Sequence, residues 1–443
     1  MVSIRNGINS LPVNPEKSTT YSNRKICIVW LALLGASLSK AMLTGSVSIG
    51  DVLFGCAVVA CFLFICPRIY IQRWSVYIIL LIMWAVVGGI FASGFSPFAF
   101  SEIEFLKSFA KLSFYGIGTI LIGSYIRKMD KDTIGKAVLC ILTLHAFIAL
   151  YIYIAQLVEQ ISGTHLPHEF FWFGQGGPLT FGERLKPWEI GGIVLNKARG
   201  IFSEPSTFGI FQILGLAFLY FKSPAITQKH TWRSNVIFVS ILLTFALSTY
   251  ILLFVFLLIL VLKQRKIKQL FSLTRLILGA VIVIFMLFAF APLSLPKVFY
   301  QRIIHRFVGF VQGHDRTGGV RVMGSWETAK EIIVKSPIFG SGLGNLDVAF
   351  KSTGRILYYA ELVFKEAAIF NIPAYVLGSM GIIGFVIFFL FIAYLVVRIP
   401  AAGAVFLVSL FIYGSFLGTT FWVFYILLVT GIPSGAFRRK SLK

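Results

Sequence analysis

Residues 199–206, RGIFSEPS, are followed directly by residues 207–220, TFGIFQILGLAFLY. The first stretch carries an arginine and a glutamate, whereas the second is almost wholly apolar. Charges at the start of an apolar helix need a physical reason, because burying a charge without a partner is costly. If the apolar run crosses a bilayer, the charged stretch lies at a membrane surface, so the membrane character of the whole chain decides how it is interpreted.

The composition is that of a membrane protein. Hydrophobic residues make up 57% of the chain and charged residues 13%, and the mean hydropathy is +0.86. These values exclude a soluble domain of ordinary composition. The apolar runs are long and continuous, which favours helices over the alternating strands of a β-barrel. The expected fold class is therefore all-α, a polytopic integral membrane protein.

The net charge of +23 is spread through the short connections between apolar runs. Such a distribution indicates membrane topology rather than a nucleic-acid-binding surface. The five cysteines lie inside or beside apolar segments, without histidines at metal-ligand spacing, and are interpreted as packing residues.

Crossing a hydrocarbon core of about 30 Å takes roughly 20 apolar residues. The chain, residues 1–443, is expected to form a single membrane domain. Residues 234–262 are either one long tilted helix or two short helices that turn near Ser248, and the second interpretation is adopted because it places the basic run 263–268 on the cytoplasmic side. About twelve transmembrane helices are then predicted, at residues 26–46, 50–67, 75–95, 105–126, 134–158, 206–222, 234–248, 249–262, 271–293, 377–398, 400–417 and 419–433.

Among the short connections of this arrangement, lysine and arginine gather on the predicted cytoplasmic side, as the positive-inside rule requires. The short loops near 47–49, 96–104 and 418 carry neither residue and are predicted to be external. Both termini are then cytoplasmic, as tails of residues 1–25 and 434–443. The first tail is polar and does not have the pattern of a cleavable signal peptide.

Two long loops, residues 159–205 and 294–376, remain on the external, periplasmic side. They are expected to be partly helical and to fold over the membrane surface. The first ends in the opening stretch, where Pro205 suits a first helical turn and places Glu204 at or just before the helix start. The simple interpretation is a helix cap worth about 0.3–1 kcal/mol, with Arg199 as ion-pair partner. In the functional interpretation Arg199 binds an anion and Glu204 positions or deprotonates a hydroxyl.

In the second loop, Arg302, His305 and Arg306 are spaced to share one helix face. Such a stripe suits a phosphate or pyrophosphate, because guanidinium groups make bidentate charge-assisted bonds. The alternative is a basic face resting on anionic lipid headgroups. Arg316 and Arg321 follow among glycines, as a flexible cap over the same site or as a solvated loop.

Trp326 to Lys335 predicts an amphipathic helix that Pro337 ends. The glycines of residues 340–344 then permit tight turns and close backbone approach. This run lacks the Lys-Ser/Thr of a P-loop, and no strand precedes it as a dinucleotide-binding fingerprint would require.

Three stretches together resemble the bacterial O-antigen polymerase and ligase superfamily of integral-membrane glycosyltransferases. Residues 199–206 are similar to the family element Arg-x-x-Gly/Phe-x-Glu-Pro-Ser. Trp326 through Asn345 is similar to a Trp followed by Pro-x-x-Gly-x-Gly-x-Gly-Asn. Asn371 before Gly381-Ile-Ile-Gly384 is similar to the family's Asn before Gly-x-x-Gly. The ligase branch typically has a histidine directly before that last asparagine, whereas this chain has Phe370. The resemblance is therefore closer to a polymerase.

The resemblance implies an enzyme that joins repeat units on undecaprenyl pyrophosphate into O-antigen or a related surface polysaccharide of the lipopolysaccharide type. The reaction would be glycosyl transfer with inversion, without metal or cofactor, at the periplasmic face of the bacterial inner membrane. Glu204, with His305 second, is the expected base. The expected pyrophosphate ligands are Arg199, Arg302, Arg306 and Arg321, and the expected substrate contacts are Ser206, Arg316, Trp326, Asn345 and Asn371. Expected partners are undecaprenyl-pyrophosphate-linked glycans and membrane lipids, with a chain-length regulator as a further candidate.

Two other functions compete. A ligase would transfer the glycan to lipid A-core, and a transporter or flippase would move the lipid-linked sugar. Transporters place charges near the bilayer midplane and often contain inverted repeats, whereas the charges here gather in long loops and no repeat is evident, which favours an enzyme. His145, in the middle of a predicted helix, is expected to be a hydrogen-bonded core histidine, the alternative being a functional group.

Overall fold

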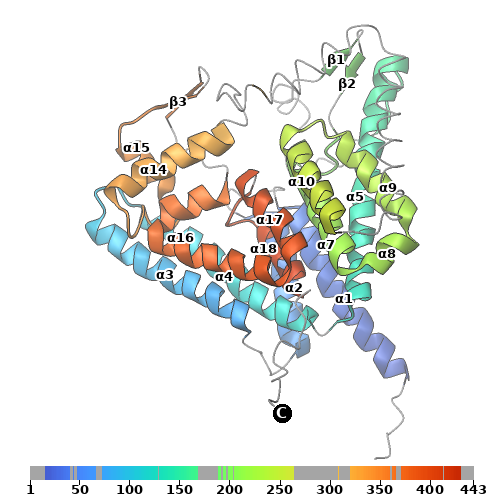
Figure 1. The fold of residues 1–443 in the computed structure, drawn as a ribbon, viewed down its shortest axis with the longest axis horizontal. Helices are drawn as coiled ribbons and strands as arrows, with labels where there is room; N and C mark the ends of the chain where they lie inside the picture. Colours follow the sequence, from blue (N-terminus) through green and yellow to red (C-terminus); the bar gives the residue numbers. More distant parts are fainter. Residues whose placement is uncertain are drawn as a thin grey trace, which may run out of the picture.

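The computed structural model shows a bundle of helices with two short β hairpins (Figure 1). It describes residues 15–39, 43, 47–65, 72–127, 129–167, 188–190, 193–195, 198–202, 204–263, 308, 320–359, 362–365, 371–412 and 414–430. The helices of the first half are α1 (Pro15–Ser37), α2 (Ile49–Ile65), α3 (Arg73–Phe95), α4 (Glu102–Ile126), α5 (Lys131–Ser162), α7 (Pro205–Lys222), α8 (Pro224–Lys229), α9 (Thr231–Leu242) and α10 (Leu247–Lys263). Those of the second half are η3 (Val320–Gly324), α14 (Ser325–Lys335), α15 (Leu346–Ser352), α16 (Ile372–Arg398), α17 (Pro400–Ile412) and α18 (Thr419–Thr430).

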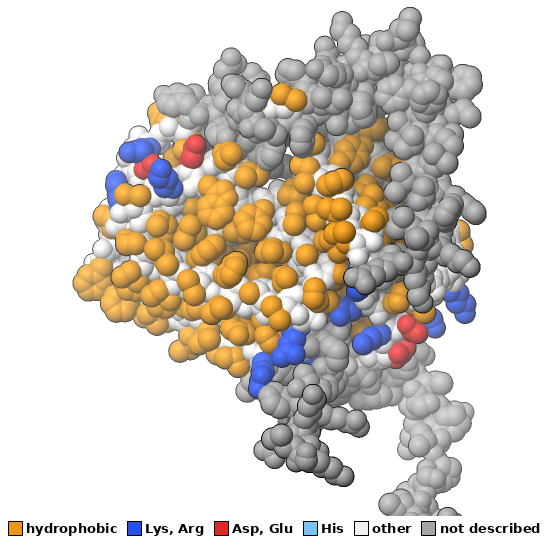
Figure 2. Space-filling model, in the orientation of Figure 1, with side chains coloured by type: hydrophobic (Ala, Val, Ile, Leu, Met, Phe, Trp, Pro, Cys, Tyr) orange, Lys and Arg blue, Asp and Glu red, His pale blue; other side chains and the backbone are white. Residues whose placement is uncertain are grey.

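Several helices are those of a membrane-embedded protein. Four of them, α3, α4, α5 and α16, are long and apolar enough to cross a bilayer, and five shorter apolar helices accompany them among the described residues. Figure 2 shows a broad hydrophobic face whose charged side chains lie at its upper and lower rims. The count of twelve crossings is not confirmed, and the predicted helix at 271–293 lies outside the described residues.

The doubtful segment 234–262 forms two helices, α9 and α10, joined by a turn at residues 243–246. Phe245 in this turn has a φ of 45°, the only positive value at a non-glycine residue of the described chain. Helix α9 has 12 residues, about 18 Å at 1.5 Å per residue. It is too short to cross the hydrocarbon core as a straight helix. It packs against α5 and α7 and leaves Trp232 and Val239 exposed, so the predicted span 234–248 is not confirmed.

Helix α7 lies at the centre of the bundle. All its residues from Pro205 to Leu219 are buried, and it contacts α5, α9, α10, α17 and α18. A helix that is apolar on every face is stable only when protein or lipid surrounds it completely. The opening stretch of sequence therefore leads into the core of the molecule.

Parts of both long loops are described. The hairpin of β1 (Trp188–Ile190) and β2 (Ile193–Leu195) belongs to the first loop, and the hairpin of β3 (Leu357–Tyr359) and β4 (Leu362–Phe364) to the second. Helices α14 and α15 confirm that the second loop is partly helical, and α14 matches the helix predicted from Trp326 to Lys335. The hairpins were not predicted.

Candidate functional site

The chain just before α7 is buried inside the bundle. The backbone N–H of Ala198 donates to the carbonyl oxygen of Leu243, in the α9–α10 turn, at 2.8 Å. Gly200 has a φ of 56° and lies so close to α5 that an added Cβ would be 3.5 Å from the carbonyl oxygen of His145. The ring of Phe202 packs against that of His145 at a centroid distance of 5.4 Å. This stretch is therefore held between α5 and the α9–α10 turn, not on an open loop surface.

Arg199 sits in this stretch and is 7% exposed. Burial lowers the pKa of its guanidinium to about 10, because a charged group loses hydration inside the protein. That pKa is still well above neutral, so Arg199 carries its positive charge at pH 7. A buried permanent cation is suited to hold an anion that reaches the same place.

Glu204 has extended backbone geometry and immediately precedes α7, with Pro205 in the first helical turn. The predicted position is thereby confirmed. Its carboxylate makes no capping hydrogen bond to the helix, while its electrostatic stabilisation by the helix N-terminus and its ion pair with Arg199 stay predictions. Its Oε2 accepts a hydrogen bond from Ser206 Oγ at 3.0 Å. The carboxylate is half-buried and fixed by its neighbour, as a proton-accepting group would need to be.

His145 is 1% exposed, with its ring edge-on to those of Phe202 and Phe211. Neither ring nitrogen has a hydrogen-bond partner within the described part of the chain. The expectation of a buried core histidine is confirmed, whereas the expected hydrogen bond is not found there.

The glycine run of the second loop docks onto a break in α16. Gly381 has a φ of 69° and interrupts the helix. Around it, the N–H of Ile382 donates to the carbonyl of Pro337 at 2.9 Å, and the N–H of Ser341 donates to that of Gly378 at 2.9 Å. The carbonyl of Met380 accepts from the indole Nε1 of Trp84 at 2.8 Å. Three backbone groups near the break are thus satisfied by protein, and the glycines permit the close approach.

Two asparagines predicted as substrate contacts have backbone roles. Asn371 Oδ1 accepts from the N–H of Ala374 at 2.9 Å and caps α16. Asn345 precedes α15, and its Oδ1 accepts from the N–H of Ser101 at 2.6 Å, joining the second loop to the start of α4. Trp326 lies half-buried in the first turn of α14. Substrate contact by these residues stays a prediction.

The cap at Asn371 predicts a stability difference between two substitutions. We expect Asn371→Ala to lower the free energy of unfolding by about 1 kcal/mol, since the first turn of α16 loses its acceptor, whereas Asn371→Ser keeps a neutral acceptor there. Thermal unfolding in detergent measures both. Equal melting temperatures for the two variants would show that the cap contributes nothing.

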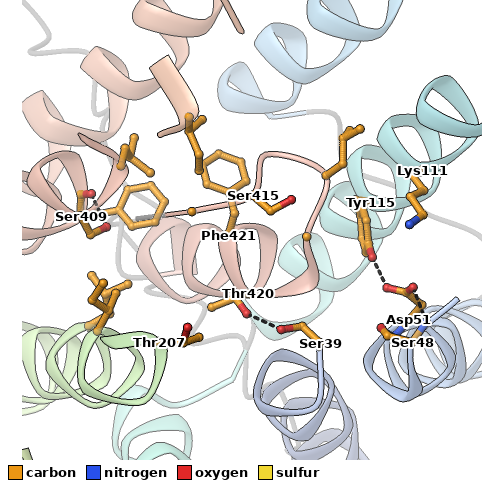
Figure 3. A pocket seen from close by; sticks show the side chains of 18 residues that line it. Ser39, Ser48, Asp51, Lys111, Tyr115, Thr207, Ser409, Ser415, Thr420 and Phe421 are labelled. Atoms are coloured by element: carbon orange, nitrogen blue, oxygen red, sulfur yellow. Dashed lines mark hydrogen bonds between the residues drawn. The ribbon is translucent and has the colours of Figure 1, made fainter. Parts of the chain in front are cut away.

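A cavity of about 200 Å³ lies among the starts or ends of several helices (Figure 3). Its apolar lining includes Ile210 and Leu214 of α7 and Phe406 of α17. Thr207 and Ile372 also line it. The helix that follows residues 199–206 and the helix that follows Asn371 therefore both reach the cavity. These residues are more than 160 positions apart in the sequence, and only packing brings them together.

One wall of the cavity is polar. Asp51 Oδ1 accepts hydrogen bonds from the hydroxyl of Tyr115 and from Thr419 Oγ1, the latter at 3.2 Å. Its Oδ2 accepts from the N–H of Ser48 at 2.8 Å, while the N–H of Asp51 donates to Ser48 Oγ at 3.1 Å. This reciprocal pair caps α2. Lys111 lines the same wall beside Tyr115 and Asp51 (Figure 3).

The structure brings together only part of the predicted site. Arg302, His305, Arg306 and Arg316 lie outside the described residues, as does the side chain of Arg321. The backbone of Arg321 belongs to η3, which contacts α17. Asn371 Nδ2 donates to the carbonyl of Val322 in η3 at 3.5 Å. The chain that carries Arg321 is therefore attached to the same helix start that lines the cavity.

Asp51, Lys111 and Tyr115 were missed from the sequence, although a signal was present. Asp51 and Lys111 fall inside the apolar segments predicted as spans, 50–67 and 105–126. Ionisable residues inside such segments are rare and usually functional.

Comparisons with known proteins add no identity. No protein-family model matches the chain, and no curated protein sequence matches it.

Proposed function

We propose that this protein is a membrane glycosyltransferase that polymerises lipid-linked oligosaccharide repeat units at the external face of the bacterial inner membrane. The observation that carries the proposal is the cavity between membrane helices on which the starts of α7 and α16 converge. Both starts follow motifs that resemble those of the polymerases, and Arg199 and Glu204 lie just before one of them. A buried cation and a fixed carboxylate so close in sequence suit a reaction that releases an anion and takes up a proton.

In this proposal the acceptor hydroxyl oxygen attacks the anomeric carbon of the donor glycan. The bond from that carbon to the pyrophosphate oxygen breaks, the bond to the acceptor oxygen forms, and the configuration inverts. The hydroxyl proton passes to Glu204, and the pyrophosphate leaves with the electron pair of the broken bond. Negative charge grows on the leaving group, so a cation placed there in advance stabilises the transition state more than the ground state.

Arg199 supplies that cation from the core of the bundle. Further cations would come from the second loop, through Arg302, Arg306 and Arg321, with His305 as the second candidate base. The attachment of η3 to Asn371 supports this role for Arg321, because it ties the backbone of the loop to a helix that reaches the cavity. The groove for the polyprenyl tails would lie along the apolar outer surface of the helices.

The transporter interpretation gains little from the break in α16. Broken membrane helices often hold substrates or ions through their freed backbone groups. Here the carbonyls of Gly378 and Met380 and the N–H of Ile382 are engaged by Ser341, Trp84 and Pro337. The break therefore serves to dock the glycine run. The ligase is the nearer alternative, although Phe370 stands where that branch has its histidine.

The deciding experiment is elongation by the purified protein in detergent. Lipid-linked repeat units are supplied as both donor and acceptor, and product lengths are read on gels. Polymers of increasing length support the proposal. Transfer to added lipid A-core without elongation would instead identify a ligase. A protein that produces neither product, yet moves the lipid-linked sugar across vesicles, would be a transporter.

The role of Glu204 predicts the effect of a conservative change. Glu204→Gln keeps an oxygen that accepts from Ser206 but cannot take the proton, so we expect the elongation rate to fall about a hundredfold. The rate per mole of protein measures this. Glu327→Gln, on the exposed side of α14, is the matched control and should elongate normally. An unchanged rate in Glu204→Gln would remove Glu204 from the mechanism.

A further inference from the structure

Four helices begin at the cavity. The lining includes residues from the first turn of α2 (Asp51), α7 (Thr207), α16 (Ile372) and α18 (Thr420), or immediately before it (Ser48). These helices have 17, 18, 27 and 12 residues. Each helix N-terminus carries roughly half a positive charge from its unpaired backbone N–H groups. The backbone therefore makes the cavity electropositive and suited to an anion.

Lys111 adds a full positive charge. It lies nine residues after the start of α4, about 13 Å along the helix axis, and it has no ion-pair or hydrogen-bond partner among the described residues. One turn earlier, Lys107 pairs with Glu104 at 2.8 Å and is exposed. A half-buried lysine that makes no ion pair with the neighbouring Asp51, or with any other described residue, beside a cavity indicates that a ligand supplies a further negative charge.

Thr207 supplies an independent observation. It is 3% exposed, its Oγ1 has no hydrogen-bond partner among the described residues, and it lines the cavity (Figure 3). Leaving a buried hydroxyl unpaired is unfavourable. A ligand oxygen in the cavity would accept its hydrogen bond.

Asp51 is the carboxylate of this lining and opposes an anion. Its two oxygens already accept from the N–H of Ser48, the hydroxyl of Tyr115 and Thr419. These bonds fix the carboxylate against the polar wall and disperse its charge over three donors. Glu204, immediately before α7, is a second carboxylate near these helix starts. The four helix starts, at roughly half a positive charge each, and Lys111 together outweigh both negative charges.

We infer that this cavity binds an oxyanion of the phosphate class, with Lys111 as its counterion and Thr207 as a hydrogen-bond donor. The volume is below the 300–1,000 Å³ typical of pockets for drug-sized ligands, so it admits one small anionic group. Ile210, Leu214 and Phe406 line the same cavity and suit the first carbons of a hydrocarbon chain attached to that group.

The identity of the anion rests on the proposed function. Polymerisation joins two lipid-linked glycans, and each carries a pyrophosphate. In the proposed reaction, Arg199 and the second loop bind the leaving pyrophosphate of the donor. The cavity, with its own cation, then holds the pyrophosphate of the acceptor. A ligase would need one such site and a polymerase needs two.

The test measures binding to the purified full chain in detergent by isothermal titration calorimetry, with inorganic pyrophosphate and geranyl pyrophosphate as probes. We expect both to bind, and Lys111→Gln to weaken binding at least about tenfold, as for loss of a charged hydrogen bond. Lys111→Arg should bind normally, and Thr207→Val should bind several-fold more weakly. Matched controls are Lys107→Gln, on the exposed turn of α4, and Thr119→Val, a buried threonine away from the cavity.

Equal binding by Lys111→Gln and wild type, with an unchanged melting temperature, would overturn the site. Equal loss in Lys107→Gln would also overturn it, since surface charge alone would then explain binding. Tighter binding of geranyl than of inorganic pyrophosphate supports the lipid source, and equal affinity contradicts it. Wild type that elongates glycans but does not bind the probes through Lys111 refutes this inference alone. Lys111-dependent binding without elongation refutes the proposed polymerase and leaves the anion site standing.

Discussion

Arg199→Ala is expected to abolish long glycan chains and to lower the elongation rate about a thousandfold. The expected loss is at the upper end for removing one group that stabilises transition-state charge. The reason is its location: Arg199 is almost fully buried, retains its charge at neutral pH and lies five residues before Glu204. Water cannot readily replace a guanidinium at such a position.

Replacing Arg199 with lysine gives a second measurement at this position. Lysine keeps the charge but presents a single ammonium in place of a planar fork, so Arg199→Lys should also lose most activity if a bidentate phosphate contact matters. Elongation assays on equal amounts of membrane-inserted protein measure both variants. Arg355→Ala is the control, because Arg355 is 67% exposed and pairs with Glu331 at the surface. Wild-type polymer lengths in Arg199→Ala would exclude Arg199 from the site. Full activity in Arg199→Lys would show that Arg199 acts through its charge alone, as in a simple ion pair.

Gly381→Ala is expected to destabilise the protein by about 3 kcal/mol or more. A Cβ at Gly381 would lie 2.0 Å from the carbonyl oxygen of Ile338, a backbone atom that cannot rotate away. The positive φ itself costs roughly 1–2 kcal/mol, and forced overpacking adds about 1–3 kcal/mol. Since the N–H of Ile382 next to it binds Pro337, the substitution should also separate the glycine run from α16. Elongation should therefore fall together with the melting temperature.

Gly354→Ala separates the two causes of this destabilisation, the positive φ and the contact of the added Cβ with backbone. Gly354 has a φ of 68°, nearly that of Gly381, but an added Cβ would meet no atom within 4 Å. We expect it to lose only the conformational contribution of about 1–2 kcal/mol. Thermal unfolding in the same detergent compares them. Equal melting temperatures for the two variants would mean that the contact with Ile338 contributes nothing to stability.

Local sequence predicted several elements because their causes are local. The proline of residue 205 fixed the start of α7, and Pro337 ended α14, since proline constrains only its neighbours. The two helices of 234–262 followed from charge placement. The length of α9 was not predictable in the same way, because its last turn gives way to a bend that packs against Ala198. For the glycine run, the sequence indicated a close backbone approach. It did not indicate that the partner is the break in α16 at Gly381.

The sequence by itself determined that this is a helical membrane protein, because hydropathy and helical length depend on residues next to each other in the chain. It also marked Arg199, Glu204 and the glycine run as unusual. Only the tertiary structure decided that Arg199 is buried and that Asp51, Lys111 and Thr207 face one cavity. These positions lie on three different helices, and no local pattern specifies how helices pack. Their convergence is a property of the bundle, set by the apolar surfaces that the helices bury against one another.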